Sequence, residues 1–237
     1  MVQAKTVVVT GASRGIGLAT IKALEVRGVH VLACARGPID DSSSIASLHV
    51  DLRDPEAPHQ IVETALERFG TIDAWINNAA TLAPIGPAHT HDPRALRDAL
   101  SLNVTALTIC STLFAEHVAR REGSGVLVNL SSGAAGANEE GWAHYCGAKA
   151  YVDRFTEVLA VEGRAFGLRA MSVAPGVVDT EMQAEIRSTP KERFPSRERF
   201  VELFETGSLK HPDIVGAQLA DLALGEVVPS DVVFRLD

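Results

Sequence analysis

Strand-like and helix-like segments alternate from one end of the chain to the other, and few folds accept that order. Short runs of β-branched and apolar residues predict seven strands, at Lys5–Thr10, Val29–Cys34, Ser47–Asp51, Asp73–Asn77, Gly125–Ser131, Leu168–Ala174 and Asp231–Phe234. Helical spacing of apolar residues predicts helices between them, at Ile16–Arg27, Pro55–Phe69, Pro93–Arg120, Ala143–Phe166 and Pro212–Leu224. Strands that are apolar on both faces are typical of a parallel sheet covered by helices on each side. The pattern therefore predicts a three-layer α/β protein.

The alternation continues without a linker-like stretch or an internal repeat, so we expect a single domain over residues 1–237. It breaks once, after Pro175-Gly176, where residues 180–211 are charged and contain Pro190 and Pro195. A long irregular insertion in a regular chain is usually functional or a linker. We expect 180–211 to form a lid over a substrate site, although its apolar residues could equally pack two short helices onto the domain.

Charge and cysteine content exclude several classes of function. The net charge of −8 argues against nonspecific binding to nucleic acid or to an anionic membrane surface. Three widely spaced cysteines without a CxxC pair argue against a disulfide framework or a zinc site, which is typical of a reducing compartment. The chain has no run of about 18 apolar residues and no signal-peptide core. We expect a cytoplasmic protein without a metal.

A glycine-rich segment, TGASRGIG, joins the first predicted strand to the first predicted helix. Glycines there permit a tight turn and let the backbone approach a pyrophosphate at the helix N-terminus. Such a string alone fits a plain strand–helix turn equally well, but here a strand precedes it and a helix and a second strand follow. It therefore predicts dinucleotide binding, with these candidate residues: Gly11, Ser13, Arg14, Gly15, Ile16 and Gly17.

The glycine spacing TGxxxGxG resembles that of the short-chain dehydrogenase/reductase family. Further motifs follow in the family's order along essentially the whole chain: Asn77-Asn78-Ala79-Ala80, Asn103, Ser132, Tyr145-x-x-x-Lys149, and Pro175-Gly176 followed by Thr180. Ala80 departs from the glycine that the family usually has. The resemblance implies a Rossmann-type doubly wound parallel sheet with strand order 3-2-1-4-5-6-7 and an oxidoreductase that uses a nicotinamide dinucleotide.

The Tyr145 and Lys149 pair suits proton transfer. One helical turn separates the two residues, so both side chains lie on the same side of the helix. A neighbouring ammonium favours the phenolate, so we expect Lys149 to lower the pKa of Tyr145 toward neutrality. Tyr145 would then protonate a carbonyl oxygen. By the resemblance, Ser132 binds that oxygen in preference to its rival Ser131, Lys149 also holds the nicotinamide ribose, and Asn103 supports a water leading to Lys149.

Arginines at the second predicted strand indicate the phosphorylated cofactor, NADP. Ala35 stands where an NAD enzyme of the family has an acidic residue, and Arg36 follows it. Together with Arg14 it offers two guanidiniums to a 2′-phosphate, unless both are ordinary surface arginines. The resemblance adds these cofactor-binding positions: Asp51 and Leu52 beside the adenine, Asn78, Ala79, Tyr145, Lys149, Pro175, Gly176, Val178 and Thr180.

The segment Gly141-Trp142-Ala143-His144-Tyr145-Cys146 resembles sepiapterin reductases and bacterial and fungal benzil reductases within the family. Val233 stands where the former carry a pterin-anchoring aspartate. We therefore expect an NADPH-dependent carbonyl reductase acting on a bulky aromatic or 1,2-dicarbonyl substrate. The alternatives are sepiapterin-type reduction, alcohol oxidation on the same site, and an NADP-binding regulatory or scaffold protein without activity.

Three further features receive plain interpretations. His89 and His91 could suggest metal ligands, but Asp92 serves better as a helix cap before Pro93. Cys146 and His144 do not form a nucleophilic pair, because residues adjacent in a helix point in different directions. The helix around Leu96–Phe114 is apolar nearly all round, so we expect a second chain to cover it, in a homodimer or homotetramer.

Overall fold

A seven-stranded parallel sheet forms the centre of the molecule in the computed structural model, which describes residues 4–236. Its order is β3-β2-β1-β4-β5-β6-β7, which confirms the predicted sheet. The strands are β1 Thr6–Thr10, β2 His30–Ala35, β3 Ile45–His49, β4 Ala74–Asn77, β5 Gly125–Leu130, β6 Leu168–Ala174 and β7 Val233–Arg235. The order reverses between β1 and β4, and ligands of open α/β sheets bind at such a point.

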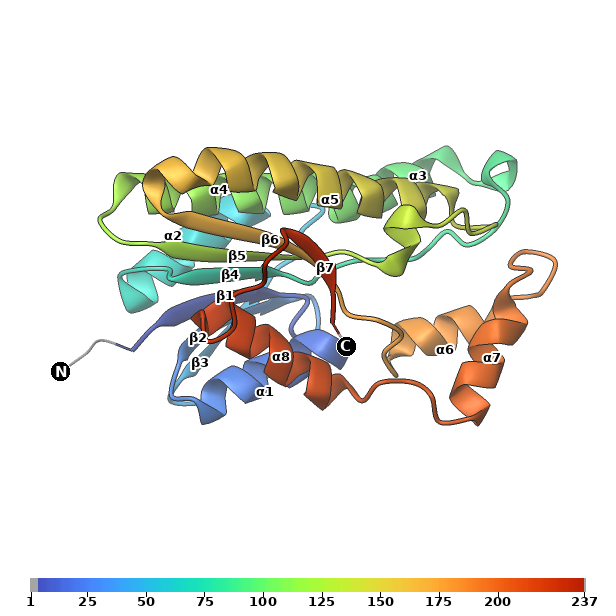
Figure 1. Ribbon diagram of the computed structural model, residues 1–237, viewed down its shortest axis with the longest axis horizontal. Helices are drawn as coiled ribbons and strands as arrows, with labels where there is room; N and C mark the ends of the chain where they lie inside the picture. Colours follow the sequence, from blue (N-terminus) through green and yellow to red (C-terminus); the bar gives the residue numbers. More distant parts are fainter. Residues whose placement is uncertain (1–3, 237) are drawn as a thin grey trace.

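Helices cover both faces of the sheet (Figure 1). One layer consists of α1 Gly15–Val26 and α8 Pro212–Leu224, and the other of α2 Ala57–Phe69, α4 Leu107–Arg120 and α5 Ala143–Gly163. Successive side chains of β1 point to opposite layers: Val7 and Val9 belong to the core beneath α1 and α8, and Val8 belongs to the other core. All three valines are fully buried, because both faces of the sheet are covered.

Two predicted boundaries shift by about two residues because local hydrogen bonds decide them. β3 begins at Ile45 rather than Ser47, since Ile45 pairs with Val31 of β2 and the Ser42 hydroxyl accepts the Ile45 backbone N–H. α2 begins at Ala57, because the Asp54 carboxylate accepts the Glu56 backbone N–H and closes a turn before the helix.

The predicted helix Pro93–Arg120 is continuous but not regular. α3 Pro93–Leu100 begins at Asp92, whose side chain accepts the Arg94 backbone N–H and so confirms the predicted cap. A π-helical turn, Ser101–Ala106, separates α3 from α4, and such turns often occur at functional sites. The whole stretch is long and apolar enough to cross a membrane by composition alone, but Phe114 and Val118 are fully buried against the sheet, as in a core helix.

The segment after β6 forms α6 Glu181–Ser188 and α7 Arg197–Glu205, which lie beside the sheet near the C-terminal end of the chain (Figure 1). Phe194 and Phe200 are buried, and they pack on Trp142 with ring centroids 4.7 Å and 5.5 Å away. Phe204 is half exposed and contacts the Arg187 guanidinium at 4.0 Å. Two of the three phenylalanines therefore hold this segment on the domain rather than lining an open site.

Candidate active site

The glycine-rich segment forms a tight turn at the carboxyl end of β1. Gly11 and Gly15 have φ of 66° and 53°, a region that favours glycine. A Cβ on Gly17 would lie 2.2 Å from the Gly11 carbonyl oxygen, so only glycine fits there. The Asn78 amide donates to the carbonyls of Thr10 and Gly11 at 2.9 Å and 3.0 Å, which fixes the turn to the end of β4. The backbone can thus approach a pyrophosphate closely, as the predicted dinucleotide requires.

An open pocket of about 860 Å³ lies along this edge of the sheet. Fourteen of the residues predicted from the sequence line it: Gly11, Ser13, Arg14, Gly15, Ile16, Arg36, Asp51, Leu52, Asn78, Ala79, Tyr145, Lys149, Pro175 and Thr180. Five predicted residues lie outside its wall: Gly17, Asn103, Ser132, Gly176 and Val178. The size and the glycine turn fit a nicotinamide dinucleotide.

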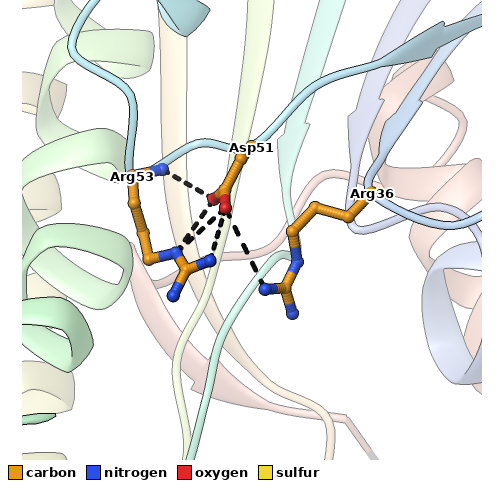
Figure 2. Close-up of polar contacts among 3 residues, drawn as sticks. All are labelled: Arg36, Asp51 and Arg53. Carbon is orange, nitrogen blue, oxygen red and sulfur yellow. Dashed lines mark hydrogen bonds and ion pairs between the residues drawn. The ribbon is translucent and has the colours of Figure 1, made fainter.

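A carboxylate between two guanidiniums forms the pocket wall at the ends of β2 and β3 (Figure 2). Asp51 accepts the Arg53 backbone N–H at 3.0 Å and the Arg53 Nη2 at 2.5 Å, whereas Arg36 Nη1 lies 4.0 Å away. The hydrogen bonds from Arg53 lower the pKa of Asp51 to about 2. Within residues 4–236 this long contact is the only ion pair of Arg36, so its guanidinium stays free for an anion. The sequence did not predict a role for Arg53, because an arginine that follows a strand usually lies on the surface without a specific function.

Arg14 is not free. Its guanidinium forms an ion pair with Glu181 at the start of α6, and both side chains are 66% exposed. The contact joins the glycine turn to the segment after β6, on the rim of the pocket. A phosphate would have to compete with Glu181 for Arg14. Of the two predicted cations, Arg36 therefore has the longer carboxylate contact, 4.0 Å to Asp51.

Tyr145 and Lys149 lie together in the buried part of the pocket. Both come from the first turns of α5, and they are 6% and 3% exposed. Lys149 Nζ lies 5.7 Å from the centroid of the Tyr145 ring and donates to the Leu130 carbonyl at 2.7 Å, at the end of β5. A phenol and an ammonium thus share one water-poor site, an arrangement suited to proton transfer.

The predicted lowering of the Tyr145 pKa is wrong. Burial raises the pKa of Tyr145 to about 12, and a hydrogen bond with Ser132 only partly opposes that shift. Burial also lowers the pKa of Lys149 to about 8, with the charge of Asp153 acting the other way. The low dielectric around both groups disfavours their charged forms, and burial is the largest cause of both shifts. Tyr145 is therefore a protonated phenol at neutral pH, ready to donate.

Two neighbouring serines occupy different places. Ser132 hydrogen-bonds with Tyr145, and its hydroxyl accepts the Ala134 backbone N–H at 3.1 Å. Ser131 lines the pocket, and its buried hydroxyl has no hydrogen-bond partner within the described part of the chain. The backbone N–H of Ser131 bonds to Val173 of β6, which fixes the pair at the end of the sheet.

Asn103 lies in the π-helical turn, and within residues 4–236 the structure gives it no hydrogen bond to Tyr145 or Lys149. Its side-chain amide accepts the Thr81 backbone N–H at 2.9 Å and donates to the Thr81 carbonyl at 2.7 Å. These bonds tie the loop after β4, which lines the pocket, to the long helix. The predicted water bridge to Lys149 stays a prediction.

The pocket is also lined by Leu82, Leu102 and Met182, and by Glu181 and Glu185 of α6. His91 packs edge-on against the His144 ring, with centroids 5.5 Å apart. No group of three or more His, Cys, Asp or Glu side chains within residues 4–236 could hold a metal ion. Tyr145 and Lys149, with Ser132 beside them, offer acid–base chemistry toward a carbonyl or alcohol.

A dinucleotide turn next to a buried tyrosine and lysine and a half-buried serine defines an oxidoreductase that acts on CH–OH or C=O groups with a nicotinamide dinucleotide. The chain belongs to the short-chain dehydrogenase family, whose model matches residues 5–191. Members of this family bind NAD(P), and this chain is a carbonyl reductase.

Similar proteins include two benzil reductases that form (S)-benzoin. The Bacillus subtilis enzyme is 39% identical over 224 residues, which cover 91% of each chain. The Bacillus cereus enzyme is 31% identical over 245 residues, which cover 98% of each chain. Among solved structures, the KRED1-Pglu enzyme has a TM-score of 0.86 and 30% identity, and the match covers 96% of this chain and 98% of that one.

Proposed function

We propose that this enzyme uses NADPH to reduce one carbonyl of a bulky aromatic 1,2-diketone of the benzil type. The cluster of buried Tyr145 and Lys149 with half-buried Ser132 at the edge of the dinucleotide pocket carries the proposal, because it places a protonated phenol where a carbonyl oxygen can reach it. The similarity to benzil reductases supports the substrate class.

Each residue of the cluster has a distinct part in the reduction. The dinucleotide supplies a hydride when it is bound. Tyr145 donates its phenolic proton to the carbonyl oxygen, Ser132 hydrogen-bonds the same oxygen, and Lys149 provides positive charge as the phenol loses its proton. Because the pKa of Tyr145 is raised to about 12, the neutral acid predominates at neutral pH. Reduction uses this neutral phenol, whereas alcohol oxidation on the same site would need the phenolate.

NADPH is proposed over NADH because of Arg36. Its guanidinium lies on the pocket wall with only a 4.0 Å contact to Asp51, and Ala35 offers no carboxylate for a ribose 2′-hydroxyl. The Asp51 carboxylate is hydrogen-bonded to the Arg53 guanidinium (Figure 2). The Arg36 guanidinium therefore stays available to bind the 2′-phosphate.

The substrate end of the pocket suits a neutral, apolar compound. Leu82, Leu102 and Met182 provide apolar surface on the pocket wall, and the carboxylate of Glu185 disfavours an anionic substrate, whereas the charge of Glu181 is compensated by Arg14. Val233 on β7 leaves no carboxylate in the place of a pterin anchor. The charges and the apolar surface together support an aromatic diketone.

Steady-state kinetics with NADPH test the proposal. An extra phenyl group buried in an apolar pocket should contribute a few kcal/mol of binding, so benzil should show a KM at least about tenfold below that of 2,3-butanedione. A clear preference for sepiapterin, or no turnover of aromatic diketones, would contradict the substrate class while leaving carbonyl reduction intact.

The protein is further proposed to act as a cytoplasmic homodimer or larger assembly. Along α5, Tyr151, Val158 and Val161 leave 40%, 50% and 63% of their side chains exposed, on the layer that also contains α4. The Thr108 hydroxyl of α4 lies 3.1 Å from the Tyr151 hydroxyl, which joins the two helices into one surface. Such an apolar helical surface is typically covered by a partner.

A further inference from the structure

Lys149 is a buried ammonium with little to compensate its charge. It is 3% exposed, and the hydrogen-bond partner given by the structure is the Leu130 carbonyl. No carboxylate within residues 4–236 comes within ion-pair distance of its Nζ. A buried charge of this kind shifts toward its neutral form unless another group opposes the loss of hydration.

Asp153 lies one helical turn beyond Lys149 on α5, on the side that faces β6. The hydroxyl of Ser172, a fully buried residue in the middle of β6, donates to Asp153 Oδ1 at 2.6 Å. Asp153 has no ion pair of its own among the described residues. The hydrogen bond fixes an uncommitted carboxylate beside the helix turn that carries the ammonium.

We propose that Asp153, held by Ser172, is a positioning residue that keeps Lys149 protonated in the buried site and so sustains proton transfer from Tyr145. It acts through Lys149 and touches neither the substrate nor the cofactor. Ser172 in turn holds the carboxylate in place, as outer residues commonly orient the groups that react.

Among the described residues near Lys149, no other charged group is placed to compensate its ammonium as Asp153 is. On α5, Arg154 and Glu157 pair with each other at 2.8 Å. The groups that face Lys149 and Asp153 from β5 and β6, the Leu130 carbonyl and the Ser172 hydroxyl, are uncharged. On β7, Arg235 is exposed. Consistent with this geometry, the charge of Asp153 raises the pKa of Lys149 against the larger lowering by burial.

The pH profile of kcat for benzil reduction separates this role from a structural one. Asp153→Asn keeps an acceptor for Ser172 but removes the negative charge, which should lower the pKa of Lys149 further. The alkaline limb of the kcat profile should therefore move to lower pH by about one unit. Asp153→Glu retains the negative charge, so its alkaline limb should lie close to that of the unmodified enzyme. The matched variant Ser172→Ala keeps the carboxylate but frees it, and should move the limb less than Asp153→Asn does. An unmoved limb in Asp153→Asn would overturn the proposal.

Thermal unfolding of the enzyme without cofactor or substrate gives a second readout. The folded pKa of Lys149, about 8, lies below its ordinary value of 10.5, so the ammonium costs stability below pH 8 and this cost is relieved as the pH rises. Removing the Asp153 charge should increase this loss of stability only at low pH, where Lys149 is protonated. Asp153→Asn should therefore lower Tm by about 3 °C at pH 6 and leave it nearly unchanged at pH 9.

A Tm loss in Asp153→Asn that is equal at pH 6 and pH 9 would mean a plain tether between α5 and β6 and would contradict the proposal. The unfolding measurement needs no substrate, so it stands if the enzyme does not reduce benzil. Failure of the proposed substrate class and failure of the role of Asp153 are thus distinguished.

Discussion

At the scale of single residues, burial controls the chemistry of Tyr145. A pKa raised to about 12 keeps the phenol protonated over the whole neutral range. The residue can give its proton to a substrate only as charge develops on the carbonyl oxygen, and Ser132 and Lys149 are placed to stabilise the phenolate that remains. The buried position therefore makes Tyr145 an acid first and a base only at high pH.

Replacement of Tyr145 by Phe removes the proton donor and keeps the ring that packs on Trp142 at 5.8 Å. We expect kcat to fall by about 10²–10⁴-fold. Cofactor binding, followed by quenching of protein fluorescence, should persist, because the remaining pocket wall is untouched. Turnover close to that of the unmodified enzyme would rule out the proposed donor.

Arg36 should decide cofactor preference. A charge-assisted hydrogen bond contributes about 1.5–3 kcal/mol, so kcat/KM should favour NADPH over NADH by at least about tenfold. Arg36→Asp should narrow or invert that ratio. Arg14→Met is the matched control, and it should change the ratio less because Arg14 is paired with Glu181. Equal kcat/KM values for the two cofactors in the unmodified enzyme would contradict the assignment.

At the scale of elements, α6 and α7 are held on the domain by aromatic packing rather than by the sheet. Trp142, at the start of α5, stacks on Phe194 with an interplanar angle of 10° and also contacts Tyr145. Ile186 of α6 belongs to the same apolar cluster. The segment that borders the substrate end is therefore linked by packing to the residue that donates the proton.

Phe194→Ala should destabilise this packing. Removing a fully buried phenylalanine costs about 3–5 kcal/mol of unfolding free energy. Phe204→Ala is the matched control in the same segment: it removes a half-exposed ring that contacts Arg187 and should cost less than about 1 kcal/mol. Urea denaturation measures both, and equal losses would contradict the assignment of Phe194 as the anchor.

At the scale of the whole molecule, the layer with α4 and α5 leaves apolar side chains uncovered. Light scattering at micromolar concentration should give the mass of a dimer or a larger assembly. Val158→Glu places a charge on this surface and should shift the mass toward the monomer, because burying an unpaired carboxylate is costly. Val26→Glu, at an 88% exposed position on α1 in the opposite layer, should not. A monomer mass for the unmodified protein would refute the assembly.

The local patterns of the sequence determined the strands and the dinucleotide turn: apolar runs specify strands, and Gly11, Gly15 and Gly17 permit one backbone shape that other residues cannot adopt. The sheet order and most of the residues that line the pocket followed from the resemblance to the family. The motif Tyr145-x-x-x-Lys149 places its two side chains together through helix geometry alone.

The tertiary structure decided what depends on partners distant along the chain. Arg14 meets Glu181 only because the segment after β6 returns to the glycine turn, and Asp153 meets Ser172 only because α5 packs on β6. The pKa of Tyr145 also depends on residues that are distant along the chain. A spacing between two residues indicates that they are neighbours, but the balance between burial and charge depends on how completely the rest of the fold excludes water from them.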